Sequence, residues 1–166
     1  SESSFPQSSI DTHVSIVLSI GRVWSKVVAL ASPASLWEVT SSNAVATVRG
    51  TAFSMERRNN TTKFIGVEHT IEVHPIDQKT GKRIDRIIVP VTENKILNIS
   101  DNTAREITEK PVEGSKFLIA SNAGKELLDS PWVTNGKKQD DSVNKIVLRM
   151  ESFRAQGKTD IEVRKE

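Results

Sequence analysis

The stretch Thr40–Val73 constrains the fold more than any other part of the chain. Two runs of alternating apolar residues, Ala44–Met55 and Lys63–Val73, flank the polar segment Glu56–Thr61. Alternation with a period of two is typical of a strand that buries one face. The polar segment contains Asn59-Asn60, and asparagine tolerates the left-handed backbone of tight turns. The stretch therefore predicts a β-hairpin on which the rest of the chain is built.

The strand pattern continues on both sides of this hairpin. Apolar alternation or β-branched content marks further strands at Thr12–Ile20, Arg22–Leu30, Leu36–Thr40, Arg86–Val91 and Lys95–Ile99. Pro90 has no backbone N–H for a ladder, so we expect it at a strand end or on an edge strand. The pattern predicts about seven short strands within residues 12–100.

Helical spacing replaces the strand pattern after about Ser100. Glu113–Asp129 has apolar residues at helical intervals, and Ser130-Pro131 is typical of a helix start with proline at the first position. Asp140 or Asp141 is expected to cap a further helix, whose apolar stripe consists of Val143, Ile146, Val147, Met150 and Phe153.

These patterns predict a mainly β fold, with an α+β content overall. We expect a Ser-rich disordered entry at residues 1–10, and a compact β-roll or β-helix-like domain at residues 11–100. Residues 101–166 are expected to form a helical extension that packs on this domain.

Composition excludes several classes of function. The chain carries 23 basic and 21 acidic residues without a long block of one sign, so we predict no nucleic-acid partner. Aromatic residues make up 5% and tyrosine is absent, which disfavours a base-stacking platform. With no cysteine, the chain has no disulfide, thiolate metal ligand or thiol nucleophile.

The sequence contains no convincing active site. No serine lies in a Gly-x-Ser-x-Gly turn, and the histidines are His13, His69 and His74. On one strand, positions 69 and 74 point to opposite faces, so we expect a partly buried strand His69 and a solvated turn His74. We predict no catalytic, cofactor-binding or metal-binding residue, and hence no enzyme and no cofactor. An enzyme of another type would need His69 or His74 in a pocket with a carboxylate or hydroxyl.

Three segments resemble the FecR domain family of bacterial envelope proteins. The lead-in of glycine and an aromatic residue is matched by Gly21–Trp24, and the strand that ends in Gly-Thr-x-Phe is matched by Ala44–Phe53. A polar turn and a Val-x-Val type strand are matched within Phe64–Val73. The resemblance covers about residues 12–100, and it departs from the family pattern at Glu68-His69, where the family usually has Glu-Gly.

The resemblance implies a non-catalytic, extracytoplasmic module that acts through protein contacts in sensing, signalling or envelope scaffolding. The motif residues are expected to be structural, and they are Trp24, Arg49, Gly50, Thr51 and Phe53. The candidate interaction surface is the hairpin tip, with Arg57, Arg58, Asn59 and Asn60.

The implied location is the cell envelope, either periplasmic or on the cell surface. No apolar run approaches the roughly 20 residues of a spanning helix. The chain starts at Ser1 with a polar segment, so we expect an upstream anchor in a longer chain. The alternative function is a cell-surface β domain that binds a glycan or another small ligand.

Overall fold

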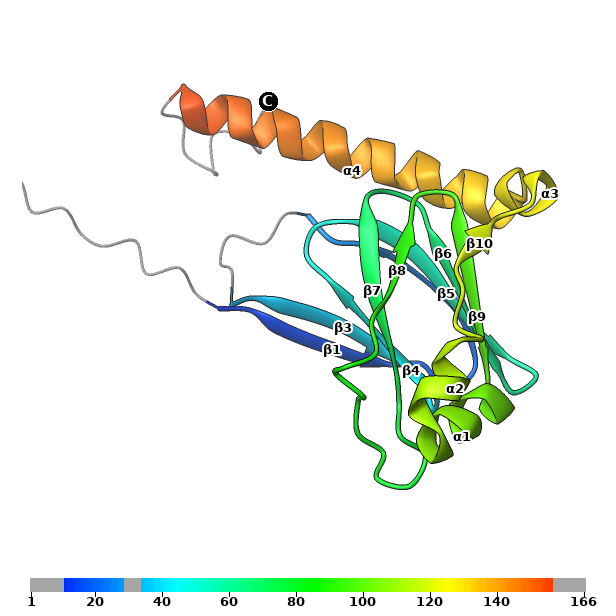
Figure 1. The fold of residues 1–166 in the computed structure, drawn as a ribbon. Helices are drawn as coiled ribbons and strands as arrows, with labels where there is room; N and C mark the ends of the chain where they lie inside the picture. Colours follow the sequence, from blue (N-terminus) through cyan, green and yellow to red (C-terminus); the bar gives the residue numbers. More distant parts are fainter. Residues whose placement is uncertain (1–10, 29–33, 157–166) are drawn as a thin grey trace, which may run out of the picture. The chain divides into compact units, whose positions relative to one another are not determined.

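The computed structural model describes residues 11–28 and 34–156, in two compact units that divide the chain at residues 124 and 125 (Figure 1). The expected disordered entry at residues 1–10 lies outside the described residues. The mainly β fold class is confirmed, because two five-stranded sheets make up most of the first unit. A long helix dominates the second unit.

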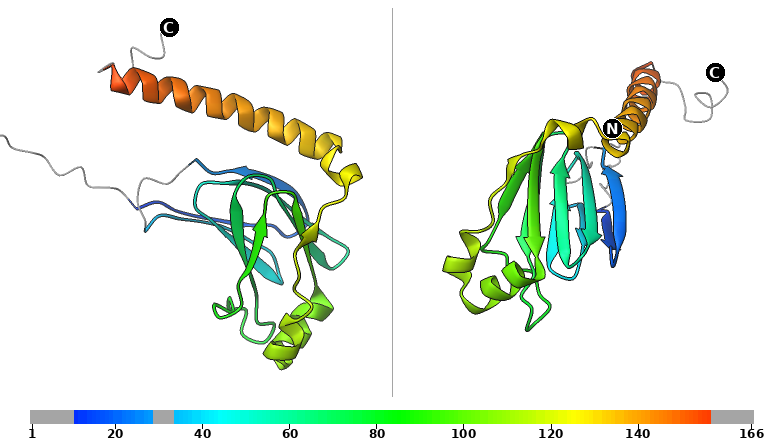
Figure 2. Two further views of the ribbon diagram at one scale, coloured as in Figure 1. Left: turned by 45° about the horizontal axis from the view of Figure 1, so that its top comes forward. Right: turned by 90° about the vertical axis from the view of Figure 1, so that its right-hand side faces the viewer.

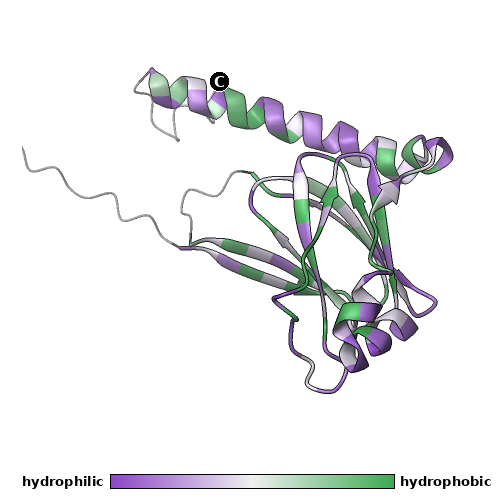
Figure 3. Ribbon diagram, viewed as in Figure 1, coloured by the Kyte–Doolittle hydropathy of each residue, from purple (hydrophilic) through white to green (hydrophobic). Residues whose placement is uncertain are grey.

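The two sheets divide the strands of the first unit between them. The first sheet has the order β1-β3-β4-β7-β8, and the second has the order β10-β9-β6-β5-β2. The strands are β1 (His13–Val17), β2 (Gly21–Lys26), β3 (Leu36–Thr40), β4 (Ala44–Val48), β5 (Ala52–Arg58), β6 (Thr61–Gly66), β7 (Thr70–Pro75), β8 (Val89–Thr92), β9 (Lys95–Ser100) and β10 (Ser121–Asn122). The hydropathy colours alternate along β1 and β3, as a half-buried strand requires (Figure 3). Pro90 lies on the edge strand β8, as expected.

The predicted hairpin is present, but it spans both sheets. β5 and β6 pair around Asn59-Asn60, whose φ angles of 49° and 59° are those of a tight left-handed turn. β4 and β7 pair in the other sheet. The expectation of one continuous strand over Ala44–Met55 is therefore wrong. Gly50, with a φ of 97°, bends the chain from the first sheet into the second.

The returning arm crosses between the sheets beside this bend. The backbone N–H groups of Val67 and Glu68 both donate to the Ala52 carbonyl, at 3.1 and 3.0 Å. The Thr51 hydroxyl donates to the Glu68 carbonyl, and the Lys26 ammonium pairs with the Glu68 carboxylate. Hydrogen bonds thus connect the crossing from β4 to β5 with the crossing from β6 to β7.

We expect Gly50→Val to lower the free energy of unfolding by about 1–3 kcal/mol, because a β-branched residue is strained at this φ. Urea unfolding would measure the change. Gly124→Val is the control, since nothing lies within 4 Å of a Cβ placed at Gly124. Equal stability of the two variants would contradict the role of Gly50 as the bend.

The core of the first unit lies between the sheets and is closed at one end by two helices. The largest fully buried side chains include Phe53, Met55 and Phe64 from the second sheet and Ile71 from the first. α1 (Asp101–Glu109) adds Ala104 and Ile107 to the same core, and α2 (Pro111–Ser115) lies against α1 (Figures 1 and 2). The compact unit therefore continues past the expected boundary at residue 100. The expected helix over Glu113–Asp129 is wrong, since α2 ends at Ser115 and β10 follows.

The second unit contains α3 (Lys125–Leu128) and α4 (Pro131–Ala155). The Ser130 side chain caps α4 by accepting from the Val133 N–H, as expected for Ser-Pro at a helix start. The expected second start at Asp140 or Asp141 is wrong, because the helix continues through both. Among the described helices, none is both long and apolar enough to cross a membrane. Whether residues 125–166 pack on the β-rich unit stays a prediction.

Candidate functional site

The β5–β6 hairpin carries a row of charged side chains on the outer face of the second sheet. The register places Glu56 opposite Lys63 and Arg58 opposite Thr61, and β2 adds Arg22 opposite Glu56. Since side chains alternate between faces along a strand, these five residues share one face. With Asn59 of the turn they line an open cleft of about 380 Å³.

Glu56 organises the cations of this cleft. Its carboxylate accepts from the Arg22 Nε at 2.8 Å and from the Lys63 Nζ at 3.3 Å. Burial alone would raise the pKa of Glu56, but the hydrogen bonds and charges of Arg22 and Lys63 outweigh burial and hold the pKa below its usual value. Glu56 is therefore ionised at neutral pH and holds both cations in place along the cleft.

Arg58 supplies a guanidinium that no carboxylate neutralises in the part of the chain that the structure describes. It is exposed, and within the described residues it takes part in no ion pair. The cleft holds three cations and one carboxylate, so its net charge is +2. A planar guanidinium beside an ammonium suits a carboxylate or another anion, which Arg58 can bind through two N–H groups.

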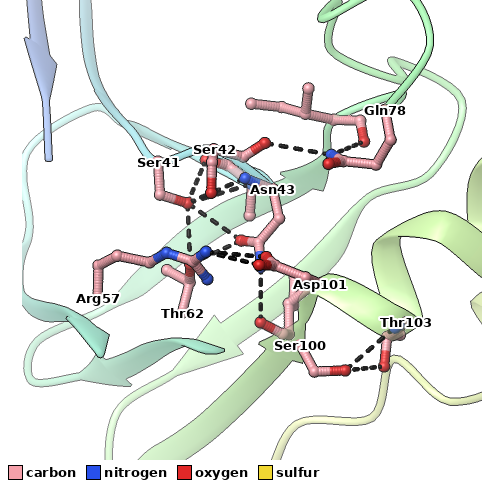
Figure 4. Close-up of polar contacts among 12 residues, drawn as sticks. Ser41, Ser42, Asn43, Arg57, Thr62, Gln78, Ser100, Asp101 and Thr103 are labelled. Carbon is pink, nitrogen blue, oxygen red and sulfur yellow. Dashed lines mark hydrogen bonds and ion pairs between the residues drawn. The ribbon is translucent and has the colours of Figure 1, made fainter. Parts of the chain in front are cut away.

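A buried polar network holds the hairpin from its inner side (Figure 4). The Arg57 Nη2 donates to both carboxylate oxygens of Asp101 at 2.9 Å, and the Asp101 N–H donates to the Asn60 carbonyl at 2.8 Å. The Asn43 amide donates to Asp101 at 2.9 Å and accepts from the Thr62 hydroxyl at 2.6 Å. The network connects the loop between β3 and β4 with β5, β6 and α1, so it fixes the turn that carries the cleft.

The structure divides the candidate interaction residues between the two faces of the hairpin. Arg57 is 8% exposed and belongs to the inner network. Arg58, Asn59 and Asn60 are exposed, and Arg58 and Asn59 line the cleft.

The five motif residues lie at β2 and at the first crossing between the sheets. Phe53 is fully buried, Thr51 is buried and bound to the Glu68 carbonyl, and Gly50 forms the bend. Trp24 lies half-buried on β2, opposite Ser54. Arg49 is exposed, and none of the described residues forms an ion pair with it. None of the five lines the cleft.

Sequence reasoning missed Arg22 and Lys63 as members of the cleft. The alternation along the hairpin contained the signal for Lys63, since it shares a face with Glu56 and Arg58. Arg22 is 34 positions away from Glu56 in the sequence, and only the pairing of β2 with β5 brings the two together.

A second basic cluster lies on the segment that connects β7 with β8. Lys82, Arg83 and Asp85 line hollows of about 350 and 510 Å³. Here the Arg83 guanidinium contacts Glu38 at 2.6 Å and Asp85 at 2.5 Å. Because carboxylates neutralise Arg83, this cluster is a weaker candidate for an anion site than the cleft.

His69 and His74 each have the environment that was expected for the other. His69 is exposed between β6 and β7 with a φ of 52°, whereas His74 on β7 is 5% exposed. The expectation failed because the chain turns at His69, which breaks the alternation that placed it on the buried face. Neither histidine lines any of the described hollows.

We expect the protein to lose stability as the pH falls below about 6.5, the ordinary pKa of histidine. Burial and the nearby Arg83 charge lower the pKa of His74, although Asp85 and Glu72 partly offset them. The unfolded chain therefore takes up this proton at a higher pH than the folded protein does. The contribution of neutral His74 is complete above the unfolded pKa and is lost as the pH falls toward the folded pKa.

Urea midpoints measured between about pH 8 and pH 5 would test this expectation. The lowered pKa values of Glu56 and Asp77 keep these two carboxylates ionised throughout that window. His74→Gln should flatten the dependence, whereas His13→Gln should retain it because His74 is still present. An equally steep fall in His74→Gln would assign the effect to other groups.

Comparisons with known proteins add a resemblance in fold. No family model matches the chain, and no curated protein matches it either. Two crystal structures described as a candidate anti-sigma factor from Parabacteroides distasonis resemble it with a TM-score of 0.48 and 10% identity. The match covers 74% of this chain and 48% or 47% of theirs, so the chain spans about half the length of these proteins.

Proposed function

We propose that this chain is a non-catalytic FecR-like module of the bacterial cell envelope that binds an acidic segment of a protein partner. The role is one of sensing, signalling or scaffolding outside the cytoplasm. The observation that carries the proposal is the hairpin-tip cleft, with three cations, one carboxylate and an unneutralised Arg58.

The geometry of the cleft favours a protein segment over a small ligand. The cleft is open and has no aromatic side chain among its lining residues, so it offers no platform on which a sugar ring could stack. Carboxylates presented by a protein segment could contact Arg58 and Lys63 together along the exposed hairpin. The envelope location rests on the resemblance of residues 12–100 to the FecR domain.

Fluorescence anisotropy with a labelled glutamate-rich peptide would test the binding step at low ionic strength, where exposed charges are least screened. We expect Arg58→Glu to weaken binding by about tenfold or more, because it reverses the charge of an exposed side chain that lines the cleft. Arg86→Glu is the matched control, since Arg86 is an exposed arginine of the second basic cluster. A loss with Arg86→Glu and none with Arg58→Glu would place the binding at the second cluster and contradict the proposal.

The cellular location and the protein partner must be tested in the native host. A photo-crosslinking residue in place of Asn59 is expected to capture one envelope protein, and Arg58→Glu should abolish that product. Recovery of the chain solely in the cytosolic fraction would contradict the envelope assignment.

A further inference from the structure

The four edge strands of the two sheets differ in how they are protected from pairing with another strand. The edge strand β8 contains Pro90, and β10 has two residues. The edge strand β2 carries Arg22 and Lys26, both in ion pairs. Proline, short length and charge are the features that protect sheet edges. The edge strand β1, with the sequence His-Val-Ser-Ile-Val, has none of them.

The ladder between β1 and β3 determines which backbone groups of β1 point outward. The Leu36 N–H donates to the Thr12 carbonyl, and the Leu18 N–H donates to the Thr40 carbonyl, both at 2.8 Å. In a parallel pair, alternate residues direct both backbone groups at the partner strand. The backbone N–H and C=O groups of the even-numbered residues of β1 therefore point toward β3.

The N–H and C=O groups of His13, Ser15 and Val17 consequently point away from β3. Among the described residues, no hydrogen bond joins these groups to another element. The side chains of the same three residues are exposed, and Val17 is 73% exposed. Within residues 11–28 and 34–156, no strand pairs with the outer side of β1, which is the edge of the first sheet (Figure 1).

We propose that β1 pairs antiparallel with β1 of a second copy of this chain, about a twofold axis at Ser15. The outward groups at positions 13, 15 and 17 are symmetric about Ser15. An antiparallel pair would place Ser15 opposite Ser15 and His13 opposite Val17, and each such pair exchanges two hydrogen bonds. The strand contains no Asp, Glu, Lys or Arg, so two copies bring no like charges together.

This pairing joins the first sheets of two copies into one continuous sheet with an isologous interface. The contact is a short strand, so it belongs to the weak, concentration-dependent class of interfaces. It goes beyond the proposed function and does not involve the cleft, which lies on the second sheet. A failure of acidic-peptide binding would therefore leave this inference intact. A failure of dimerisation would likewise leave the proposed function intact.

Sedimentation velocity of the full chain over a wide concentration range tests the pairing. We expect the wild-type chain to shift from monomer toward dimer as its concentration rises. Ser15→Pro should raise the dissociation constant about tenfold or more, because it removes the two central N–H donors of the dimer. The Ser15 N–H points outward, so the ladder to β3 loses no donor.

Charged substitutions at Ser15 test whether Ser15 lies opposite Ser15 of the second copy, and they do so without the proline variant. Ser15→Lys and Ser15→Glu should each be monomeric alone, because like charges would lie directly opposite each other. An equimolar mixture of the two should recover the dimer. Ile88→Lys, an exposed position next to the opposite edge strand, should dimerise like the wild type. A monomeric wild-type chain at every concentration, a dimer that persists in Ser15→Lys, or no recovery in the mixture would overturn the proposal.

Discussion

Replacing Gly66 with alanine is expected to lower the free energy of unfolding by about 3 kcal/mol, the largest effect of any single methyl group we predict. A Cβ at this position would lie 2.1 Å from the Thr92 carbonyl oxygen and 2.7 Å from the Thr92 carbonyl carbon. Both atoms belong to the backbone, so no side-chain rotation relieves the clash. The Asn94 N–H also donates to the Gly66 carbonyl at 2.9 Å, which fixes the distance between the two segments.

Gly66 is the last residue of β6. It lies beside the connection through which the chain passes from β8 in the first sheet to β9 in the second. A shift of this connection would disturb both sheets, so the cost should appear in global unfolding. For a chain of this size, 3 kcal/mol corresponds to a melting temperature lower by about 6–12 °C. Gly124→Ala is the control, because its Cβ would meet open space. An unchanged midpoint in Gly66→Ala would mean that the β8–β9 connection can move away without cost.

The hairpin shows which part of the fold local sequence determines. The Asn59-Asn60 turn was predictable, because residue type and position alone specify a left-handed turn between alternating runs. The change of sheet at Gly50 was not, since Arg49-Gly50-Thr51 is equally compatible with a bend inside a single strand. The close approach at Gly66 depends on Thr92, 26 positions away in the sequence, and local patterns contain no such information.

The helices also show that local sequence predicts local interactions but not tertiary burial. Ser130-Pro131 predicted the start of α4 correctly, because capping is a local interaction. α1 was not predicted, although Ser100 caps it by accepting from the Thr103 N–H at 3.0 Å. Its apolar contribution consists of Ala104 and Ile107, which is too little for a clear helical stripe. Tertiary burial against the β core, and not the helical pattern, accounts for this element.

The candidate site was predictable as a location but not in its composition. The polar hairpin tip was identified from the turn. The assignment of Arg57 to the inner face and Arg58 to the cleft follows from the alternation, but Asp101 as the partner of Arg57 is 44 positions away. Adjacent arginines with the same chemistry consequently have different roles.

Arg57→Ala and Arg58→Ala are expected to differ sharply in stability although the residues are neighbours. Arg57→Ala should lower the free energy of unfolding by about 3 kcal/mol, because it leaves the Asp101 carboxylate without its cation and opens a gap beneath the turn. The side chains of Arg57 and Asp101 are 10% and 25% exposed, so solvent compensates the loss only in part. Arg58→Ala should change stability by no more than about 0.5 kcal/mol, because Arg58 is exposed and forms no ion pair within the described residues.

Urea unfolding of the two variants would measure this difference, and a double-mutant cycle with Asp101→Ala would isolate the pair. Since the Asp101 N–H also binds the Asn60 carbonyl, loss of Arg57 should loosen the turn and weaken acidic-peptide binding several-fold in the folded protein. Arg58→Ala should weaken binding at unchanged stability. Equal stability of the two variants would contradict the division of the hairpin into a structural face and a binding face. Loss of stability in Arg57→Ala with unimpaired binding would show that the turn keeps its geometry without the network beneath it.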